Sequence, residues 1–293
     1  MTVFYLSYTL TLLYSNTLLN NKQLNHSMKI YSYLTMLTIG LTLGCQTNPV
    51  TGRKSLDLVS SSEMQSMSYT EYGTFITAHT LSTNAEQSAM VKRVGTRIQK
   101  AVEDFMAQKS QSKQLSGFKW EFHLVEDPEI NAWCMPGGKV VVYTGIMPLI
   151  KSETDLAVVL GHEIGHAIAN HGGERMSQGM VQKFGGEALS LAMSSKPAET
   201  KALFSQAYNT GSNVAILLPY SRKDESEADH MGLIFMSMAG YNPDEAIVFW
   251  QSMKTASGGK STNILMSTHP SDDKRIADIK QWLPEVKAKY YKP

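Results

Sequence analysis

The most constraining feature of the sequence is a His-Glu-x-x-His pattern at residues 162–166, inside an apolar segment at 154–170. The aliphatic residues of that segment predict a buried α-helix. On a helix the two histidines project about 40° apart on one face, which suits two ligands of a tetrahedral zinc ion. Glu163 then lies beside the metal, where a carboxylate can take a proton from an activated water. A chance pattern in a solvated helix is the alternative, and the apolar surroundings disfavour it.

A third protein ligand decides the type of zinc site. His171 would suggest a metzincin, but that class has glycine three and histidine six residues after the second histidine, where this chain has Ala169 and Gly172. His171 also lies about 180° around the helix from His162. We therefore expect His171 to be a polar residue at the C-terminus of the helix.

The better candidate for the third ligand is Glu225, in an acidic segment at 221–229. Asp229 lies one helical turn later on the same face, so it can hydrogen-bond the far nitrogen of a ligand histidine. Glu227 points to the opposite side. Two acids at this spacing are by themselves more often a solvated helix face, and the upstream histidines reverse that interpretation. We predict one zinc ion per chain, held by His162, His166 and Glu225.

The rest of the chain predicts an α+β domain. Ser61-Ser62-Glu63 predicts the cap of a helix over 63–79, and apolar residues have helical spacing over 85–109. Alternation begins at Phe118, and a β-branched run follows at 139–143. Pro136-Gly137-Gly138 before this run predicts a hairpin. We expect a zincin-like fold, mainly helical, with a small antiparallel sheet bearing an active-site edge strand.

Composition excludes two classes of protein. The 27 basic and 26 acidic residues leave a formal net charge of +1, which gives no reason to expect a nucleic-acid partner. Only two cysteines occur, Cys45 and Cys134, so the fold does not depend on a disulfide framework. Cys134 falls in the predicted hairpin with no Cys/His arrangement evident, and we expect a packed free thiol.

The N-terminal segment predicts an export signal. From Met28 the chain reads Met-Lys, then an apolar stretch to Leu43, then Gly44-Cys45, which resembles a bacterial lipobox. We expect Cys45 to carry lipid and to begin the mature chain, with a longer membrane anchor as the alternative. The predicted domains are an upstream and signal segment (1–44), a linker (45–58) and a zinc metallopeptidase domain (59–293).

Several motifs together resemble a known family. They are the histidine motif, Ser221-Arg222 with the acidic segment after it, residues 131–138, and Thr268-His269-Pro270 with Arg275. The resemblance is to the membrane-associated gluzincin peptidases, which include the CAAX prenyl proteases, HtpX, the mitochondrial Oma-type proteases and bacterial periplasmic lipoprotein or chaperone-protease members. It runs from about Asn48 to Arg275. The chain is most similar to the periplasmic members, because no apolar run after Cys45 approaches spanning length.

The resemblance implies roles for further residues. Asn131, Ala132 and Trp133 resemble the family's active-site edge strand, which would bind an extended substrate by backbone pairing. His269 resembles a movable histidine that occupies the open metal position or assists catalysis, and a helix-start residue before Pro270 is the alternative. Arg275 is either a transition-state contact or a structural ion pair.

We therefore expect a zinc-dependent endopeptidase that hydrolyses extended or misfolded cell-envelope proteins, with Glu163 as general base. The expected location is the bacterial cell envelope, as a periplasm-facing lipoprotein held at the membrane by its lipid, and Gln46 favours the outer membrane. The alternative function is an envelope chaperone or assembly factor whose zinc site is latent and plugged by His269. A purely structural zinc would instead have four protein ligands and no exchangeable water.

Overall fold

The computed structural model describes residues 45–184, 203–204, 221–256, 265, 269 and 273–292. The chain divides into two compact units, up to Cys45 and from Gln46 onward, and the second holds the structure described below. The predicted signal segment lies outside the described residues. None of the described helices is both long and apolar enough to cross a membrane.

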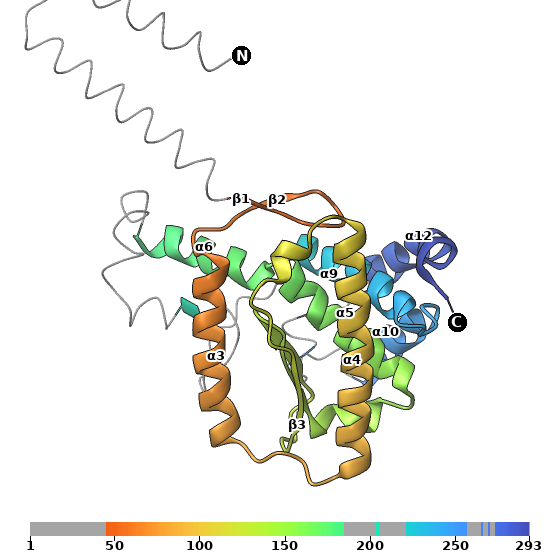
Figure 1. The fold of residues 1–293 in the computed structure, drawn as a ribbon. Helices are drawn as coiled ribbons and strands as arrows, with labels where there is room; N and C mark the ends of the chain where they lie inside the picture. Colours follow the sequence, from red (N-terminus) through yellow and green to blue (C-terminus); the bar gives the residue numbers. More distant parts are fainter. Residues whose placement is uncertain are drawn as a thin grey trace, which may run out of the picture. The chain divides into compact units, whose positions relative to one another are not determined.

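The second unit is mainly helical (Figure 1). Its long helices are α3 (Ser61–Ala78), α4 (Ala85–Gln108), α5 (Glu153–Ile168), α6 (His171–Phe184), α9 (Arg222–Met238), α10 (Glu245–Ala256) and α12 (Asp273–Tyr290). Two short 3-10 helices are η1 (Ser112–Leu115) and η2 (Thr144–Leu149). The strands are β1 (Cys45–Thr47), β2 (Lys54–Leu56), β3 (Glu121–Val125), β4 (Ala132–Met135) and β5 (Lys139–Tyr143).

The two helices that carry the predicted metal ligands begin at well-defined caps. Ser152 caps α5 with Asp155 reaching back to it, and Ser221 caps α9 with Asp224 in the same role. Each capping box satisfies backbone donors that the first helical turn leaves without a partner. The start of each helix is therefore fixed by its own sequence.

The main sheet is mixed, and the prediction of an antiparallel sheet was wrong. Its strand order is β3-β5-β4, with β5 antiparallel to β4 and parallel to β3. The antiparallel pairing of β4 with β5 confirms the predicted hairpin. In its turn Gly137 and Gly138 both have a φ of 81°, a left-handed conformation that glycine adopts easily. β5 returns between the two earlier strands, which leaves β4 as an edge strand. The β5 sequence Lys-Val-Val-Val-Tyr is buried on both faces, as is typical of a central strand.

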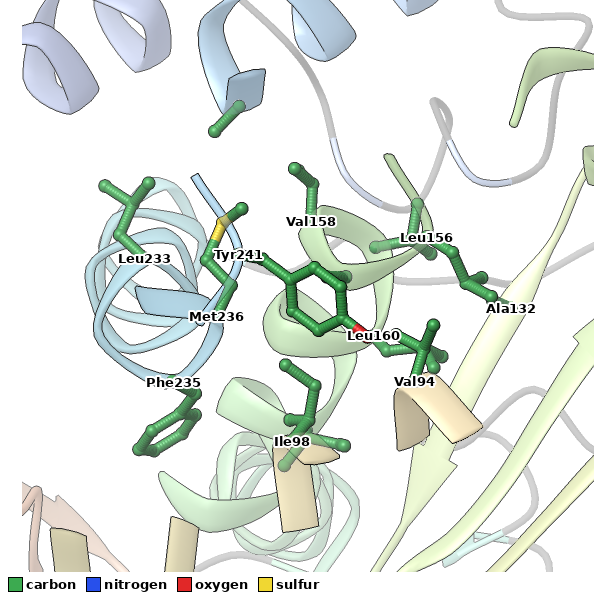
Figure 2. Close-up of a cluster of buried hydrophobic side chains, with 14 of the residues drawn as sticks. Val94, Ile98, Ala132, Leu156, Val158, Leu160, Leu233, Phe235, Met236 and Tyr241 are labelled. Atoms are coloured by element: carbon green, nitrogen blue, oxygen red, sulfur yellow. The ribbon is translucent and has the colours of Figure 1, made fainter. Parts of the chain in front are cut away.

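The sheet lies between α3 and α4 in Figure 1, with hydrophobic clusters on both faces. Successive residues of β4 point to opposite clusters, Ala132 and Cys134 to the larger and Trp133 to the smaller. Figure 2 shows the centre of the larger cluster, where side chains from α4, α5 and α9 meet. They include Val94, Ile98, Leu156, Val158, Leu160, Leu233, Phe235 and Met236.

Small residues bring the backbones of α5 and α9 into contact. A Cβ added at Gly161 would lie 2.9 Å from the carbonyl oxygen of Gly232, and one at Gly165 would lie 2.8 Å from that of Ala228. Gly161 and Gly165 are four residues apart on α5, and Ala228 and Gly232 are four apart on α9. The small residues therefore form a stripe along each helix. This contact sets the distance between the histidines of α5 and the carboxylates of α9.

The residues predicted as a linker have contacts with the folded body. Asn48 is buried, and Arg53 forms ion pairs with Glu174 of α6 and Asp224 of α9. This segment therefore contributes to the structure around the predicted metal ligands.

Replacing Gly165 with alanine tests the helix contact. Gly165→Ala should destabilise the protein by about 1–3 kcal/mol, because the added methyl meets backbone that cannot move aside like a side chain. Gly73→Ala is the matched control, since nothing lies within 4 Å of a Cβ at this α3 position. It should be neutral or stabilise by about 0.5–1 kcal/mol. Chemical unfolding measures both, and equal effects would contradict the close contact.

Candidate metal centre

Four buried side chains direct ligand atoms toward one point. They are His162 and His166 from α5, Glu225 from α9, and His269, and their ligand atoms all lie within 4.8 Å of one another. Nε2 of His162 lies 3.1 Å from Nε2 of His166 and 3.1 Å from Nδ1 of His269. The carboxylate of Glu225 lies 2.9 Å from His269, 3.3 Å from His166 and 3.4 Å from His162.

These separations match the edges of a tetrahedron around a metal ion. Bonds of about 2.0–2.1 Å from one ion to nitrogen and oxygen ligands place the ligand atoms about 3.3 Å apart. The buried Oε2 of Glu225 has no hydrogen-bond partner among the described residues and lies 3.4 Å from Nε2 of His162 and 3.6 Å from Nη1 of Arg275, so it can still accept a cation. The donor set therefore fits a metal ion.

Electrostatics favour the anionic form of Glu225. Burial opposes its charge, but the adjacent His269, His162 and His166 outweigh burial and hold the pKa of the carboxyl well below its usual range. Burial likewise holds the pKa of His166 well below the usual value, so that histidine is neutral and has a lone pair for a metal.

Asp229 and Arg275 lie behind His162. Oδ1 of Asp229 is 2.9 Å from Nδ1 of His162, which is the hydrogen bond expected from the helical spacing. Nε and Nη2 of Arg275 each donate to Asp229 at 2.6 Å, and the guanidinium lies 3.5 Å from the ring centroid of Trp250. Arg275 is therefore in a buried, two-point ion pair that orients Asp229, which in turn leaves Nε2 of His162 facing the ligand cluster.

Burial and the Arg275 cation oppose protonation of His162, but Asp229 and Glu225 outweigh them and raise its pKa to about 9. Protons and a metal ion therefore compete for this histidine.

The prediction for His171 was wrong. His171 begins α6 instead of ending the metal helix, and it is completely buried. Its Nδ1 lies 2.9 Å from Nδ1 of His166, and its Nε2 lies 3.1 Å from Glu227. The helix ends at Ile168 and the chain reverses through Asn170, whose φ is 57°, so helical geometry no longer applies at residue 171.

Glu163 is buried beside the ligand cluster without belonging to it. Its Oε1 lies 3.7 Å from Nε2 of His269 and has no hydrogen-bond partner among the described residues. Burial raises the pKa of the Glu163 carboxyl, although the nearby His269 and His162 partly offset the effect. A carboxylate with a raised pKa at this position is suited to accept a proton.

The predicted substrate strand is β4, whose outer edge pairs with no described strand. Asn131 folds back on Glu129 and on the backbone of Ala132, and the indole of Trp133 donates to Tyr143. These three side chains are buried, so any binding at this edge would use backbone groups. The nearby Cys134 is a free buried thiol whose pKa is raised by burial, in keeping with a packed residue.

The comparisons with known proteins agree with this geometry. A family model described as Peptidase family M48 matches residues 92–283. The chain belongs to peptidase family M48. Membership of this metallopeptidase family implies a bound metal, in accord with the four-residue cluster.

Three relatives illustrate the match to the M48 family. The mitochondrial metalloendopeptidase OMA1 of Schizosaccharomyces pombe is 41% identical over 180 residues, 60% of this chain and 50% of the relative. Human mitochondrial OMA1 is 28% identical over 249 residues, 82% of this chain and 46% of the relative. The β-barrel assembly-enhancing protease of Escherichia coli is 27% identical over 170 residues, 55% of this chain and 34% of the relative. The chain thus spans half or less of each, and all three are named as proteases.

These relatives overturn the predicted location. The OMA1 relatives of fission yeast, plant, budding yeast and animals are named as mitochondrial proteins, which contradicts the predicted location in a bacterial outer membrane. The lipoprotein, signal-peptide and periplasm assignments depended on a bacterial envelope and have no support from these relatives. The lipid on Cys45, which was predicted from the sequence pattern at 41–45, stays a prediction.

Removing the Glu225 carboxylate tests the ligand set. Glu225→Ala should lose much of the bound metal, because the cluster loses its one carboxylate ligand and with it the negative charge that offsets the cation. Glu103→Ala, which removes an exposed carboxylate on α4, should keep it. Metal content after gel filtration is the measurement, and a full complement of metal in Glu225→Ala would rule out Glu225 as a ligand.

Proposed function

We propose that this M48 member is a zinc-dependent endopeptidase. The observation that carries the proposal is the tetrahedral cluster of His162, His166 and Glu225 with Glu163 buried beside it. One zinc ion per chain is the proposed cofactor, because two imidazoles and a carboxylate on two crossed helices are the ligand set of a catalytic zinc site. The metalloendopeptidase relatives support the same reaction class.

The proposed reaction is hydrolysis of an internal peptide bond. Zinc bound there would supply Lewis-acid activation of the attacking water and of the scissile carbonyl. Glu163 takes the proton of the water and passes it to the leaving amine, a role for which burial raises its pKa. Asp229 and Arg275 act at a distance from the substrate by holding His162 in orientation.

Extended polypeptides are the proposed substrates. The outer edge of β4 pairs with no other strand in the described part of the chain, and β4 packs against α5, which carries Glu163. An unfolded or misfolded segment could add to this edge as a further strand. The buried side chains of Asn131, Ala132 and Trp133 would make such binding depend on backbone conformation more than on sequence.

A resting state in which the peptidase blocks its own metal site would explain why His269 is a fourth member of the ligand cluster. Nδ1 of His269 fills the position that water and substrate need in a catalytic site, so the peptidase requires His269 to leave. The same observation favours the second candidate function, a chaperone or assembly factor whose metal site stays latent. Glu163 favours the peptidase over a purely structural metal site. A structural site does not require a buried carboxylate beside its ligands, and burying one is costly.

Glu163→Gln separates catalysis from metal binding. The variant should keep its metal and its fold while casein cleavage falls about a hundred- to ten-thousand-fold, because it lacks the general base. Metal content and circular dichroism are the controls, and chelated wild-type protein gives the background rate. Wild-type cleavage by Glu163→Gln with metal intact would disprove the mechanism.

His269→Ala tests the resting state. Removing the fourth ligand should raise casein cleavage several-fold and leave the metal in place, because His162, His166 and Glu225 still hold it. The double variant Glu163→Gln with His269→Ala is the control and should be inactive. A loss of cleavage in His269→Ala would mean that His269 assists the reaction instead of blocking it.

A further inference from the structure

A second buried cluster lies behind His166, on the side away from the ligand cluster. Its inner member is His171, and its outer members are Glu227 and Asp224 of α9, Glu174 of α6, and Arg53. His171, Asp224 and Glu227 are close enough to hold a metal of their own. The guanidinium of Arg53 already supplies the cation, because it donates to Glu227 at 2.9 Å and to Asp224 at 3.1 Å. A second metal is therefore unnecessary there.

The direction of the hydrogen bonds follows from the chemistry of the groups. Glu227 accepts hydrogen bonds from Oγ1 of Thr51 at 2.5 Å and from Nε of Arg53 at 2.9 Å, and its ion pair with Arg53 favours the carboxylate form. An ionised carboxylate only accepts, so Nε2 of His171 must donate to it. Nδ1 of His171 lies 2.9 Å from Nδ1 of His166, so one of the two nitrogens donates a hydrogen bond and the other accepts it. With Nε2–H of His171 directed at Glu227, Nδ1 of His171 accepts from Nδ1–H of His166, and Nε2 of His166 is the nitrogen that faces the ligand cluster.

We propose that His171 is a positioning residue that fixes the metal-binding tautomer of His166. Glu227 sets the tautomer of His171 and, through it, that of the ligand. The inference rests on the metal site proposed above. It gives His166 an imidazole partner, whereas His162 has the carboxylate of Asp229 in the same place.

Glu227, His171 and His166 form a relay of hydrogen bonds, and the segment before α3 holds its outer end at Glu227. Oδ1 of Asn48 accepts hydrogen bonds from the backbone N–H groups of Val50 and Thr51, which closes a turn. From this turn Thr51 donates to Oε1 of Glu227 at 2.5 Å, and Arg53 donates to Oε2. Arg53 also has two hydrogen bonds to Glu174, at 2.8 and 2.9 Å. The turn at residues 48–53 thus holds the carboxylate of Glu227 in place, although it belongs to none of the helices α5, α6 and α9 that carry the site.

The affinity of the full-length protein for zinc, measured by competition with a chromophoric chelator, tests the relay. His171→Leu should weaken zinc binding about 10- to 100-fold, the usual cost of losing the partner of a ligand histidine. His171→Asn should recover most of that loss, because its side-chain oxygen can accept the hydrogen bond from Nδ1 of His166. Glu227→Gln should give an intermediate loss. His123→Leu is the control, since His123 is hydrogen-bonded to Tyr72 in the sheet, and it should bind zinc like wild type.

The visible absorption of Co²⁺-loaded protein gives a second readout. It should change in His171→Leu and return toward wild type in His171→Asn, a pattern that a merely structural role would not produce. Glu227→Gln carries the test if His171→Leu does not fold. Equal zinc affinity in wild type and in both His171 variants would overturn the relay, as would an asparagine variant as weak as leucine. Absence of zinc binding by wild-type protein would overturn the metal centre itself.

Discussion

The contact between the backbones of α5 and α9 is the constraint on which the site depends. Gly161 and Gly165 face Gly232 and Ala228 with no room for another methyl group. At a usual interaxial distance of about 8–10 Å the side chains of two helices interdigitate. Here the absence of side chains lets short groups, an imidazole and a carboxylate, reach a common centre from opposite helices. The metal geometry is thus set by residues that never touch the metal.

The site concentrates buried charge, and each charged group has a compensating neighbour. Arg275 neutralises Asp229, and Arg53 neutralises Glu227, on opposite sides of the ligand cluster. Burying any of these charges without a partner would cost several kcal/mol. Well-packed apolar residues would stabilise such a core at least as well, so the ionic arrangement is explained by its orientation of the two histidines.

The sequence predicts well which side chains come together in the ligand cluster, because most of the information is local. His162, Glu163 and His166 lie on one helical turn, and Glu225 and Asp229 on another, so helical periodicity gives their faces directly. The step from one helix to the other came from the chemistry of zinc ligands. The caps at Ser152 and Ser221 are likewise local signals.

Other features depend on contacts between distant residues. The parallel pairing of β3 with β5 follows from the insertion of β5 between two earlier strands, which no local pattern encodes. His171 was misplaced because helical rotation was extended past Ile168. Asn170 was the available signal, since asparagine tolerates a left-handed φ and the glycines after it mark a break. Arg53 was assigned to a linker because its partners lie more than a hundred residues away.

The distribution of ligands over α5, α9 and residue 269 also links metal supply to the lifetime of the fold. An unfolded chain cannot gather these groups, so a metal that binds them stabilises only the native state. At a free metal concentration a hundredfold above the dissociation constant, this linkage contributes about 2.7 kcal/mol. A chain starved of metal would unfold more often and become a substrate for other proteases. The cellular supply of that metal would then set the abundance of this peptidase as well as its activity.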